Sequence, residues 1–474
     1  MSKKIKINIV SLGCSKNTVD SEKLAGQLVN EGFEVYFNIE KLSFDFVIIN
    51  TCGFIDKAKE ESINIILSFC DFRQRTKKTF KIIVYGCLAA RYKNEMNAEI
   101  SEIDALFGIM QESKIIDYIK QNIDYNNKNI DNQNKELCSA NENNYAYDNL
   151  NKNCIAKADI LTQYTDRKLS TSKHYAYLKI SEGCDRRCSF CAIPLIKGRH
   201  ISRPIEDIVN EAKNLIKQGV KELILIAQDT SYYGLDLYKK RRLKDLLTEL
   251  CKTDIEWIRL QYSYPNEFPV EILDLMKENS KLCHYIDMPL QHINDRILHS
   301  MNRNITGNEV VKLIKNIRNK VPDIAFRTTL LVGYPTETED EFNELKSFVK
   351  EAQFDRMGAF TYSKEEGTKA AFMNDSLTQE EKLSRLDELT DIQQEISFNL
   401  NQKKIGKTFK TLIDGIEGEY YIGRTQYDSP EVDNEVLINI SQAPRLCVGN
   451  FYNVLITDAV EFDLYGIVAK DKEK

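Results

Sequence analysis

Three closely spaced cysteines in the middle of the chain are the residues whose spacing most directly suggests chemistry. Cys184, Cys188 and Cys191, the loop cysteines, form a C-x3-C-x2-C pattern just after a strand-like run at residues 175–180. Thiolates this close can converge on one centre, and they are ligands of zinc and of iron–sulfur clusters. A structural zinc site needs a fourth ligand, and the neighbourhood offers only His200. Three thiolates on a 4Fe-4S cluster leave one iron open, as a catalytic metal site requires.

Two plainer interpretations of the loop cysteines stay open: buried or disulfide-bonded residues, and half of a zinc module. The pattern, with the aromatic Phe190 before its last cysteine, resembles the signature of the radical S-adenosylmethionine (SAM) superfamily. This resemblance implies that Cys184, Cys188 and Cys191 hold a 4Fe-4S cluster whose open iron binds the methionine end of SAM. An electron from that cluster then splits SAM into a 5′-deoxyadenosyl radical, which is chemistry carried by the cofactor.

The bulk composition excludes several classes of protein. The chain has 474 residues, of which 42% are hydrophobic and 29% charged, as in a soluble protein of about two to four domains. Its net charge of −6 does not favour nucleic acid as a partner of the whole molecule. No apolar run approaches the roughly 18 residues of a membrane span, and no signal peptide is visible. We therefore expect a cytoplasmic protein without a membrane partner, whose 12 cysteines are metal ligands and core residues.

The N-terminal residues 1–120 alternate short apolar runs with amphipathic stretches. Strands are expected at 6–10, 44–50 and 81–85, and helices at 20–31 and 56–69. This rhythm predicts a parallel sheet with helices on its faces.

Three further cysteines each follow one of these strands. Cys14, Cys52 and Cys87, the N-terminal cysteine trio, stand beside glycines that allow close approach of the backbone. Because the carboxyl ends of parallel strands share one edge of a sheet, we expect the three thiols to meet there in a second cluster. Chance placement is the alternative, since free cysteine is a common buried residue. Cys70, on an apolar helix face, is expected to be packing only.

Two cysteine groups of this kind resemble the methylthiotransferase family, in which a second 4Fe-4S cluster carries the sulfur to be inserted. The run Ser15-Lys16-Asn17 after Cys14 is similar to the branch called RimO, which modifies a ribosomal protein. The sister branch, which acts on transfer RNA, typically has Gln-Met-Asn at this place. The resemblance therefore implies a protein substrate.

A polar segment separates the N-terminal region from the rest. Between residues 122 and 153 the chain contains 12 asparagines and almost no periodic apolar pattern. Such a segment cannot bury enough surface to offset the entropy of ordering, which predicts a flexible linker. Cys138 and Cys154, in or beside it, are expected not to be ligands.

From residue 175 to about 369 the βα rhythm returns with more repeats. Strands are expected at 175–180, 222–228, 257–261, 285–288, 325–332 and 356–361, with helices at 205–218, 270–278, 308–319 and 337–350. The pattern suggests a partial TIM-like (β/α)6 barrel, which is the radical SAM core by resemblance. Such barrels gather their chemistry at the carboxyl ends of the strands.

Polar residues at these strand ends are candidates for binding SAM. Gln228, Asp229 and Arg327 are the chosen candidates, although loop polar residues are common without function. His292 is expected to be a hydrogen-bonding residue rather than a metal ligand. Other residues at the strand ends could also serve in SAM binding: Thr230, Gln291, Gly333, Tyr334, Pro335, Tyr362 and Ser363.

In the C-terminal region the spacing of apolar residues changes from a helical to a strand-like period. A helix at 377–404 precedes five short strands, at 408–413, 420–424, 435–440, 451–458 and 463–468, which predict a small antiparallel β-barrel. In this position it resembles the TRAM domain, an RNA-binding module. Residues 404–466 hold 5 cations and 10 anions, a balance that opposes phosphate binding and suits a basic protein partner. The alternative is that these carboxylates form a solvated face.

Four segments of an α/β chain are therefore expected. They are an N-terminal parallel-sheet domain at 1–120, an Asn-rich linker at 121–172, the barrel with its following helix at 173–400 and the terminal barrel at 401–470.

The resemblance implies methylthiolation of the β-carbon of an aspartate in ribosomal protein S12, with one SAM as radical source and one as methyl donor. Its implied partners are the ribosomal protein or the small ribosomal subunit, and an electron donor such as flavodoxin or ferredoxin. Methylthiolation of a transfer RNA adenosine is the alternative within the same chemistry. An iron–sulfur electron carrier or an RNA-binding protein are the alternatives from other classes; a carrier would be expected to show full four-cysteine ligation.

Overall fold

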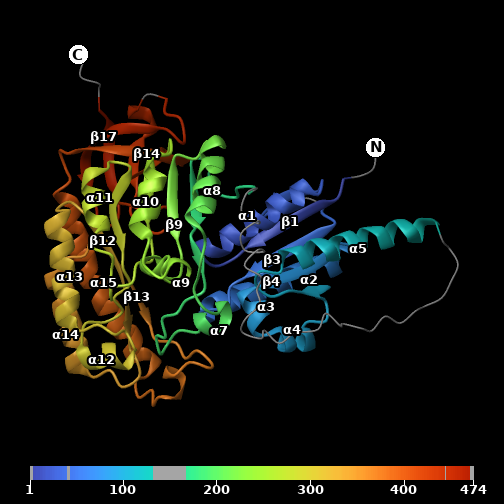
Figure 1. Ribbon diagram of the computed structural model, residues 1–474, viewed down its shortest axis with the longest axis horizontal. Helices are drawn as coiled ribbons and strands as arrows, with labels where there is room; N and C mark the ends of the chain where they lie inside the picture. The colour runs from blue at the N-terminus through green and yellow to red at the C-terminus, as the bar shows by residue number, and fades with distance from the viewer. Residues whose placement is uncertain (1–3, 40–42, 132–166, 444, 470–474) are drawn as a thin grey trace. The chain divides into compact units, whose positions relative to one another are not determined.

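The computed structural model describes residues 4–39, 43–131, 167–443 and 445–469 (Figure 1). The chain divides into two compact units, Met1–Ser170 (unit 1) and Thr171–Lys474 (unit 2). Each unit is built on its own parallel sheet.

Unit 1 contains a five-stranded sheet in the order β2-β1-β3-β4-β5, and every neighbouring pair is parallel. The strands predicted from sequence are β1 (Lys6–Ser11), β3 (Phe46–Thr51) and β4 (Lys81–Gly86). The two edge strands, β2 (Glu34–Phe37) and β5 (Ala105–Leu106), were not predicted. They have 4 and 2 residues, which is too short to show a period.

Helices cover both faces of this sheet. Successive strand residues point to opposite faces, so one face packs against α1 (Ser15–Asn30) and α5 (Glu112–Asp131). The other face packs against α2 (Asp56–Thr76), α3 (Cys87–Arg91) and α4 (Lys93–Glu99). Cys70 is buried in this second layer, which confirms its predicted role in packing.

Helix α5 corrects the start of the predicted linker. The helix is anchored on the sheet by Ile115 and Ile119, and its backbone continues to Asp131, into the asparagine-rich sequence. The rest of that sequence, with Cys138 and Cys154, lies outside the described residues. Where the description resumes, the chain is again bound to unit 1: Arg167 pairs with the buried Glu22, and Ser170 donates to the same carboxylate from its backbone N–H (2.7 Å) and its hydroxyl (2.8 Å).

Unit 2 begins with a six-stranded sheet whose order, β13-β12-β11-β10-β9-β6, follows the chain. All five pairings are parallel, which confirms the predicted partial TIM-like architecture. The strands are β6 (Tyr175–Lys179), β9 (Glu222–Ile226), β10 (Trp257–Leu260), β11 (Leu282–Asp287), β12 (Ala325–Val332) and β13 (Arg356–Thr361).

Helices of unit 2 lie along the outside of this sheet (Figure 1). They are α8 (Ile205–Lys217), α10 (Leu243–Cys251), α11 (Ile272–Glu278), α13 (Gly307–Lys320) and α14 (Glu339–Ala352). A short pair, β7 (Ser181–Glu182) and β8 (Ile201–Ser202), and a short helix, α12 (Asp295–Ser300), interrupt the repeat at the carboxyl edge of the sheet. The long helix α15 (Gln379–Gln402) follows β13.

The chain ends in a closed five-stranded barrel of order β14-β15-β16-β18-β17. Its strands are β14 (Thr408–Glu417), β15 (Tyr420–Thr425), β16 (Val436–Asn439), β17 (Phe451–Ala459) and β18 (Leu464–Val468). The antiparallel prediction is wrong at one place, because β16 and β18 pair in parallel. A ring with an odd number of strands cannot alternate in direction all the way round, so one parallel pair is required.

The segment between β15 and β16, residues 426–435, is bonded to the six-stranded sheet. Asp428 accepts from Arg356 (2.6 Å), and Asp433 accepts from Tyr285 (2.7 Å) and Arg327 (3.2 Å). These carboxylates are among the anions on which the sequence-based charge argument rested. Because they are neutralised inside unit 2, the acidic balance of the terminal barrel is not a measure of its outward charge.

Candidate active site

The loop cysteines follow β6 at the carboxyl edge of the six-stranded sheet. Their loop is held by backbone bonds at several points: Cys184 N–H donates to Gly198 (3.1 Å), and Ser189 N–H donates to Met301 (3.0 Å). The Ser189 hydroxyl also lies 2.8 Å from the Tyr334 hydroxyl, just past β12. The loop is thus held by residues distant in sequence.

The three loop thiols are close enough to influence one another. Burial raises the pKa of Cys184 to about 12, with the neighbouring Cys188 acting in the same direction. Burial also raises the pKa of Cys191, and the thiols of Cys188 and Cys184 add to the effect. In the described residues no group of three or more His, Cys, Asp or Glu side chains surrounds a single ion position. A cluster binds each thiolate on a different iron, so its ligands need not share one such point.

An aromatic ring beside Cys188 contacts two guanidinium groups. Tyr264 follows β10. The centroid of its ring lies 4.1 Å from the guanidinium carbon of Arg186 and 4.1 Å from that of Arg303. The Tyr264 hydroxyl is 3.8 Å from the Sγ of Cys188. Arg186 also donates from Nε to Asp229 (2.8 Å).

The predicted SAM-binding residues do not all lie at this edge. Asp229 is buried, and it accepts from Arg186 and from Ser231, while Gln228 is half-buried next to it. Arg327, in contrast, is the third residue of β12 and pairs with Asp287 (3.0 Å) and Asp433. The structure brings Asp229 close to the loop cysteines and leaves Arg327 in contact with the segment that joins β15 and β16.

The N-terminal cysteine trio is gathered at the carboxyl edge of the sheet of unit 1. Cys14 lies between β1 and α1, Cys52 follows β3, and Cys87 begins α3 after β4. A Cβ added to Gly13 would lie 2.6 Å from the Cβ of Cys52, and one added to Gly53 would lie 2.9 Å from the carbonyl carbon of Cys87. Burial, together with the neighbouring thiols of Cys14 and Cys87, raises the pKa of the Cys52 thiol to about 11.

Two buried asparagines hold the strand ends that carry the trio. The Asn17 side chain donates to the carbonyls of Leu12 (2.9 Å) and Thr51 (3.2 Å), and Asn50 donates to the carbonyl of Asn17 (2.9 Å). These bonds tie the segment before Cys14 to the segment before Cys52. Sequence reasoning used Asn17 only as a family marker and did not predict this structural role.

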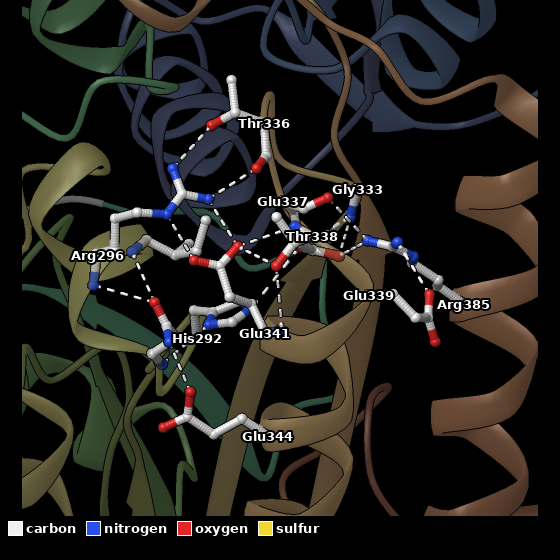
Figure 2. A network of polar contacts seen from close by, with 12 residues as sticks. His292, Arg296, Gly333, Thr336, Glu337, Thr338, Glu339, Glu341, Glu344 and Arg385 are labelled. Carbon is white, nitrogen blue, oxygen red and sulfur yellow. Dashed lines mark hydrogen bonds and ion pairs between the residues drawn. The ribbon is translucent and has the colours of Figure 1, made fainter.

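Figure 2 shows a polar network behind the loop that follows β12. Glu337 is fully buried and accepts from Arg385 of α15 (2.5 Å) and from the backbone N–H of Gly333 (3.2 Å). The Nε2 of His292 lies 3.6 Å from the same carboxylate, and its Nδ1 accepts from the N–H of Asn294 (3.0 Å). His292 is therefore a hydrogen-bonding residue in the carboxyl-edge loops. Sequence reasoning missed the pairing of Glu337 with Arg385, because the two residues lie 48 positions apart in the chain.

Comparisons with known proteins assign this arrangement to a family. The Radical SAM superfamily model matches residues 178–349, the model described as uncharacterized protein family UPF0004 matches 6–108, and the TRAM domain model matches 405–468. "Ribosomal protein uS12 methylthiotransferase RimO" of Cytophaga hutchinsonii is 48% identical over 470 residues, 99% of each chain. The protein of the same name from Bacteroides thetaiotaomicron is 47% identical over 99% of this chain and 100% of its own. The chain belongs to the RimO methylthiotransferase family.

RimO membership confirms the expected enzyme class, a radical SAM transferase, and the expected cofactors, SAM and 4Fe-4S clusters. The loop cysteines lie within the radical SAM match, and the N-terminal cysteine trio lies within the match at 6–108. A solved radical SAM methyltransferase, TsrM from Kitasatospora setae, aligns with a TM-score of 0.55 at 15% identity, over 78% of this chain and 74% of its own. That likeness is one of fold. Among the described helices of this RimO-family chain, none has the length and apolarity to cross a membrane.

Proposed function

We propose that this chain methylthiolates the β-carbon of an aspartate in ribosomal protein S12, using one SAM as radical source and a second as methyl donor. The substrate comes from the names of relatives that are 47–48% identical over nearly their whole length. The observation that carries the chemistry is the presence of two cysteine groups, one in each unit, each gathered at the carboxyl edge of a parallel sheet. A radical SAM enzyme that only generated a radical would not need the second group.

Cys184, Cys188 and Cys191 would hold the SAM-binding cluster, and Cys14, Cys52 and Cys87 the cluster that carries sulfur. When bound, the first cluster supplies the electron that cleaves SAM. The half-buried loop thiols fit this assignment because a coordinating metal removes the thiol proton and so relieves the cost of burying a thiolate. Asp229 and Gln228 would line the SAM side of the site. Arg327 stays a candidate from sequence, although its two carboxylate partners do not favour it.

The domain limits follow the same assignment. Unit 1, which extends past the predicted limit of residue 120 to Ser170, would form the sulfur-carrying domain. Residues 173–400 would form the SAM-cleaving barrel with its helix, and 401–470 the domain that helps to recognise the substrate. A one-electron carrier such as flavodoxin or ferredoxin would deliver the reducing equivalents, and the ribosomal protein or the small subunit would be the partner.

The proposal is tested by anaerobic reconstitution with iron and sulfide, followed by incubation with SAM, a reductant and either ribosomal protein S12 or transfer RNA. Mass spectrometry should show the gain of one S-methyl group on the protein, located to an aspartate, and 5′-deoxyadenosine should form. A gain on the RNA alone would reverse the substrate assignment. The absence of deoxyadenosine would point to an electron carrier or a binding protein instead.

A further inference from the structure

Arg303 is a buried cation with an unusual environment for this molecule. Its side chain is 3% exposed, and no Asp or Glu of the described chain lies within 4.0 Å of it. The other arginines that are similarly buried all pair with a carboxylate: Arg167, Arg203, Arg259, Arg356, Arg385 and Arg424.

The contacts of the Arg303 guanidinium point toward the loop cysteines. Its Nη2 donates to the carbonyl of Pro289, and its Nη1 lies 3.5 Å from the Sγ of Cys188 in hydrogen-bonding geometry. Its Nε is buried without a hydrogen-bond partner in the described structure. A buried cation without a counter-charge is costly, so a negative group is expected beside it. The sulfur of Cys188 is the atom in reach that becomes negative when it binds iron.

The position of Arg303 is fixed independently of the cluster. The residue lies in a tight turn after α12, between Asn302 and Asn304, which have positive φ angles of 57° and 51°. Asn302 donates to the carbonyl of Arg187 in the cysteine loop (2.7 Å), and Tyr264 donates from its hydroxyl to the Arg303 carbonyl (3.1 Å). The guanidinium is therefore held in place beside Cys188 by backbone bonds and by the ring of Tyr264.

Arg186, whose guanidinium also lies 4.1 Å from the centre of the Tyr264 ring, has a different charge environment. Its guanidinium donates to Asp229 at 2.8 Å, so its positive charge is largely compensated. Of the two cations that flank Tyr264, only Arg303 keeps an uncompensated charge toward the loop cysteines.

We propose that Arg303 donates a hydrogen bond to the Cys188 thiolate of the SAM-binding cluster and thereby raises the reduction potential of that cluster. The inference rests on the proposed assignment of Cys184, Cys188 and Cys191. The cluster gains one electron from the external carrier and so becomes more negative. A nearby cation and an N–H···S bond stabilise the reduced form more than the oxidised form. Arg303 is a positioning and tuning residue in this role, distinct from the ligands themselves.

The test measures the midpoint potential of the cluster by redox titration followed by electron paramagnetic resonance. The full chain carries Cys14→Ala, Cys52→Ala and Cys87→Ala, so that one cluster contributes the signal. In this background Arg303→Gln should shift the potential to more negative values. Arg303→Lys should give an intermediate shift, because lysine keeps the charge but loses the planar fork and the stacking on Tyr264. Arg296→Gln is the matched control, since Arg296 lies in α12 but pairs with Glu341, and its potential should equal that of the parent.

An unchanged potential in Arg303→Gln with full iron content would overturn the proposal. A raised KM for SAM at an unchanged potential would also overturn it and would assign the guanidinium to the SAM carboxylate. If both Arg303 variants lose their iron while Arg296→Gln keeps it, Arg303 serves cluster assembly rather than potential, and the proposal is again rejected. Failure of the parent itself to bind one cluster would instead contradict the assignment of the loop cysteines.

Discussion

At the scale of single residues, the two cysteine groups differ from the other cysteines of the chain in their neighbours. Cys52 is buried beside two other thiols, whereas Cys70 is buried among apolar side chains of the same unit. Burial alone therefore does not identify a ligand. The neighbouring thiols of Cys14 and Cys87 distinguish Cys52 as a candidate ligand from Cys70.

This difference gives a paired prediction for unit 1. Cys52→Ala should lower the iron content of the reconstituted enzyme by about half, because one of two clusters is lost, while deoxyadenosine formation from SAM continues. Methylthiolation of the ribosomal protein should stop. Cys70→Ala should keep the iron and the methylthiolation activity, with only a loss of packing energy. Loss of deoxyadenosine formation in Cys52→Ala would contradict the separate roles of the two groups.

Glu337 gives a prediction about pH. Burial opposes its ionisation, but the nearby His292 imidazole and hydrogen bonds from Arg385 and the Gly333 N–H hold its pKa below the ordinary glutamate value. A carboxylate with a lowered pKa stabilises the folded state above its unfolded pKa, near about 4.3, and this contribution is lost as the pH falls through the folded pKa.

Glu337→Gln should accordingly lower the free energy of unfolding by about 1–3 kcal/mol at neutral pH, since Arg385 loses its buried charge partner. The difference from the parent should shrink below pH 4.3 or thereabouts. Thermal unfolding at several pH values measures both effects. Glu339→Gln is the control, because Glu339 also contacts Arg385 but has a side chain that is 65% exposed. Equal effects of the two substitutions would show that burial of Glu337 does not matter.

The cysteine ligand candidates could be found from sequence because they are marked by local spacing or by position after a strand. Arg303 and Glu337 could not, because their roles depend on partners 115 and 48 residues away. Arg327 stays a candidate from sequence, although the predicted strand at 325–332 already places it near the amino end of that strand. Its pairing with Asp433 depends on how the segment between β15 and β16 packs, which no local pattern shows.

At the scale of elements, three helices of unit 2 begin in the same way. Thr306, Thr338 and Thr378 each cap a helix, and the glutamate three residues later bonds back to the capping residue. This reciprocal capping satisfies two backbone N–H groups at the helix start. The longest of these helices, α15, carries Arg385, so its N-terminal cap also orients the partner of Glu337.

Thr378→Ala should therefore destabilise the protein by about 1 kcal/mol. The matched substitution is Thr390→Ala in the middle of α15, where the hydroxyl only bonds back to the carbonyl of Leu386 (2.8 Å). That change should be neutral or slightly stabilising, because such back-bonding does not favour helix. Chemical denaturation monitored by circular dichroism would compare the two. A larger loss at position 390 would contradict the capping argument.

Buried strands and long helices were predictable because their apolar periods extend over many residues. The helix α10 was missed although Leu243, Leu246, Leu247 and Leu250 show helical spacing, so that signal was present in the sequence. The parallel pairing of β16 with β18 could not be read from any local pattern, because it follows from closure of the whole ring.

At the scale of the whole molecule, charges buried between the six-stranded sheet and the terminal barrel join these two parts of unit 2. Glu222 lies between Arg259 (2.7 Å) and Arg424 (2.8 Å), one from each part. Asp428 of the terminal barrel meets Arg356 at the start of β13. The two parts therefore should not unfold separately.

Asp428→Asn should lower the stability of unit 2 by about 3–5 kcal/mol, because it leaves the buried Arg356 without its counter-charge. Glu461→Gln, at an exposed position of the same barrel, should change stability little. Differential scanning calorimetry should show that Asp428→Asn lowers the unfolding temperature of the sheet and the barrel together. Separate transitions for the two would show that these ion pairs do not couple them.

Glu22 binds Arg167 and Ser170, which follow the asparagine-rich insertion in the sequence. These contacts show to which unit the chain returns after the insertion. Helix α5 is docked on unit 1 just before that insertion, and the segment at 167–170 is docked on unit 1 just after it. Both stems of the insertion thus belong to one body, and the covalent junction with unit 2 is the single step from Ser170 to Thr171. Lengthening or shortening the insertion would therefore change the entropy of closing the chain between two points on unit 1, which grows slowly with length.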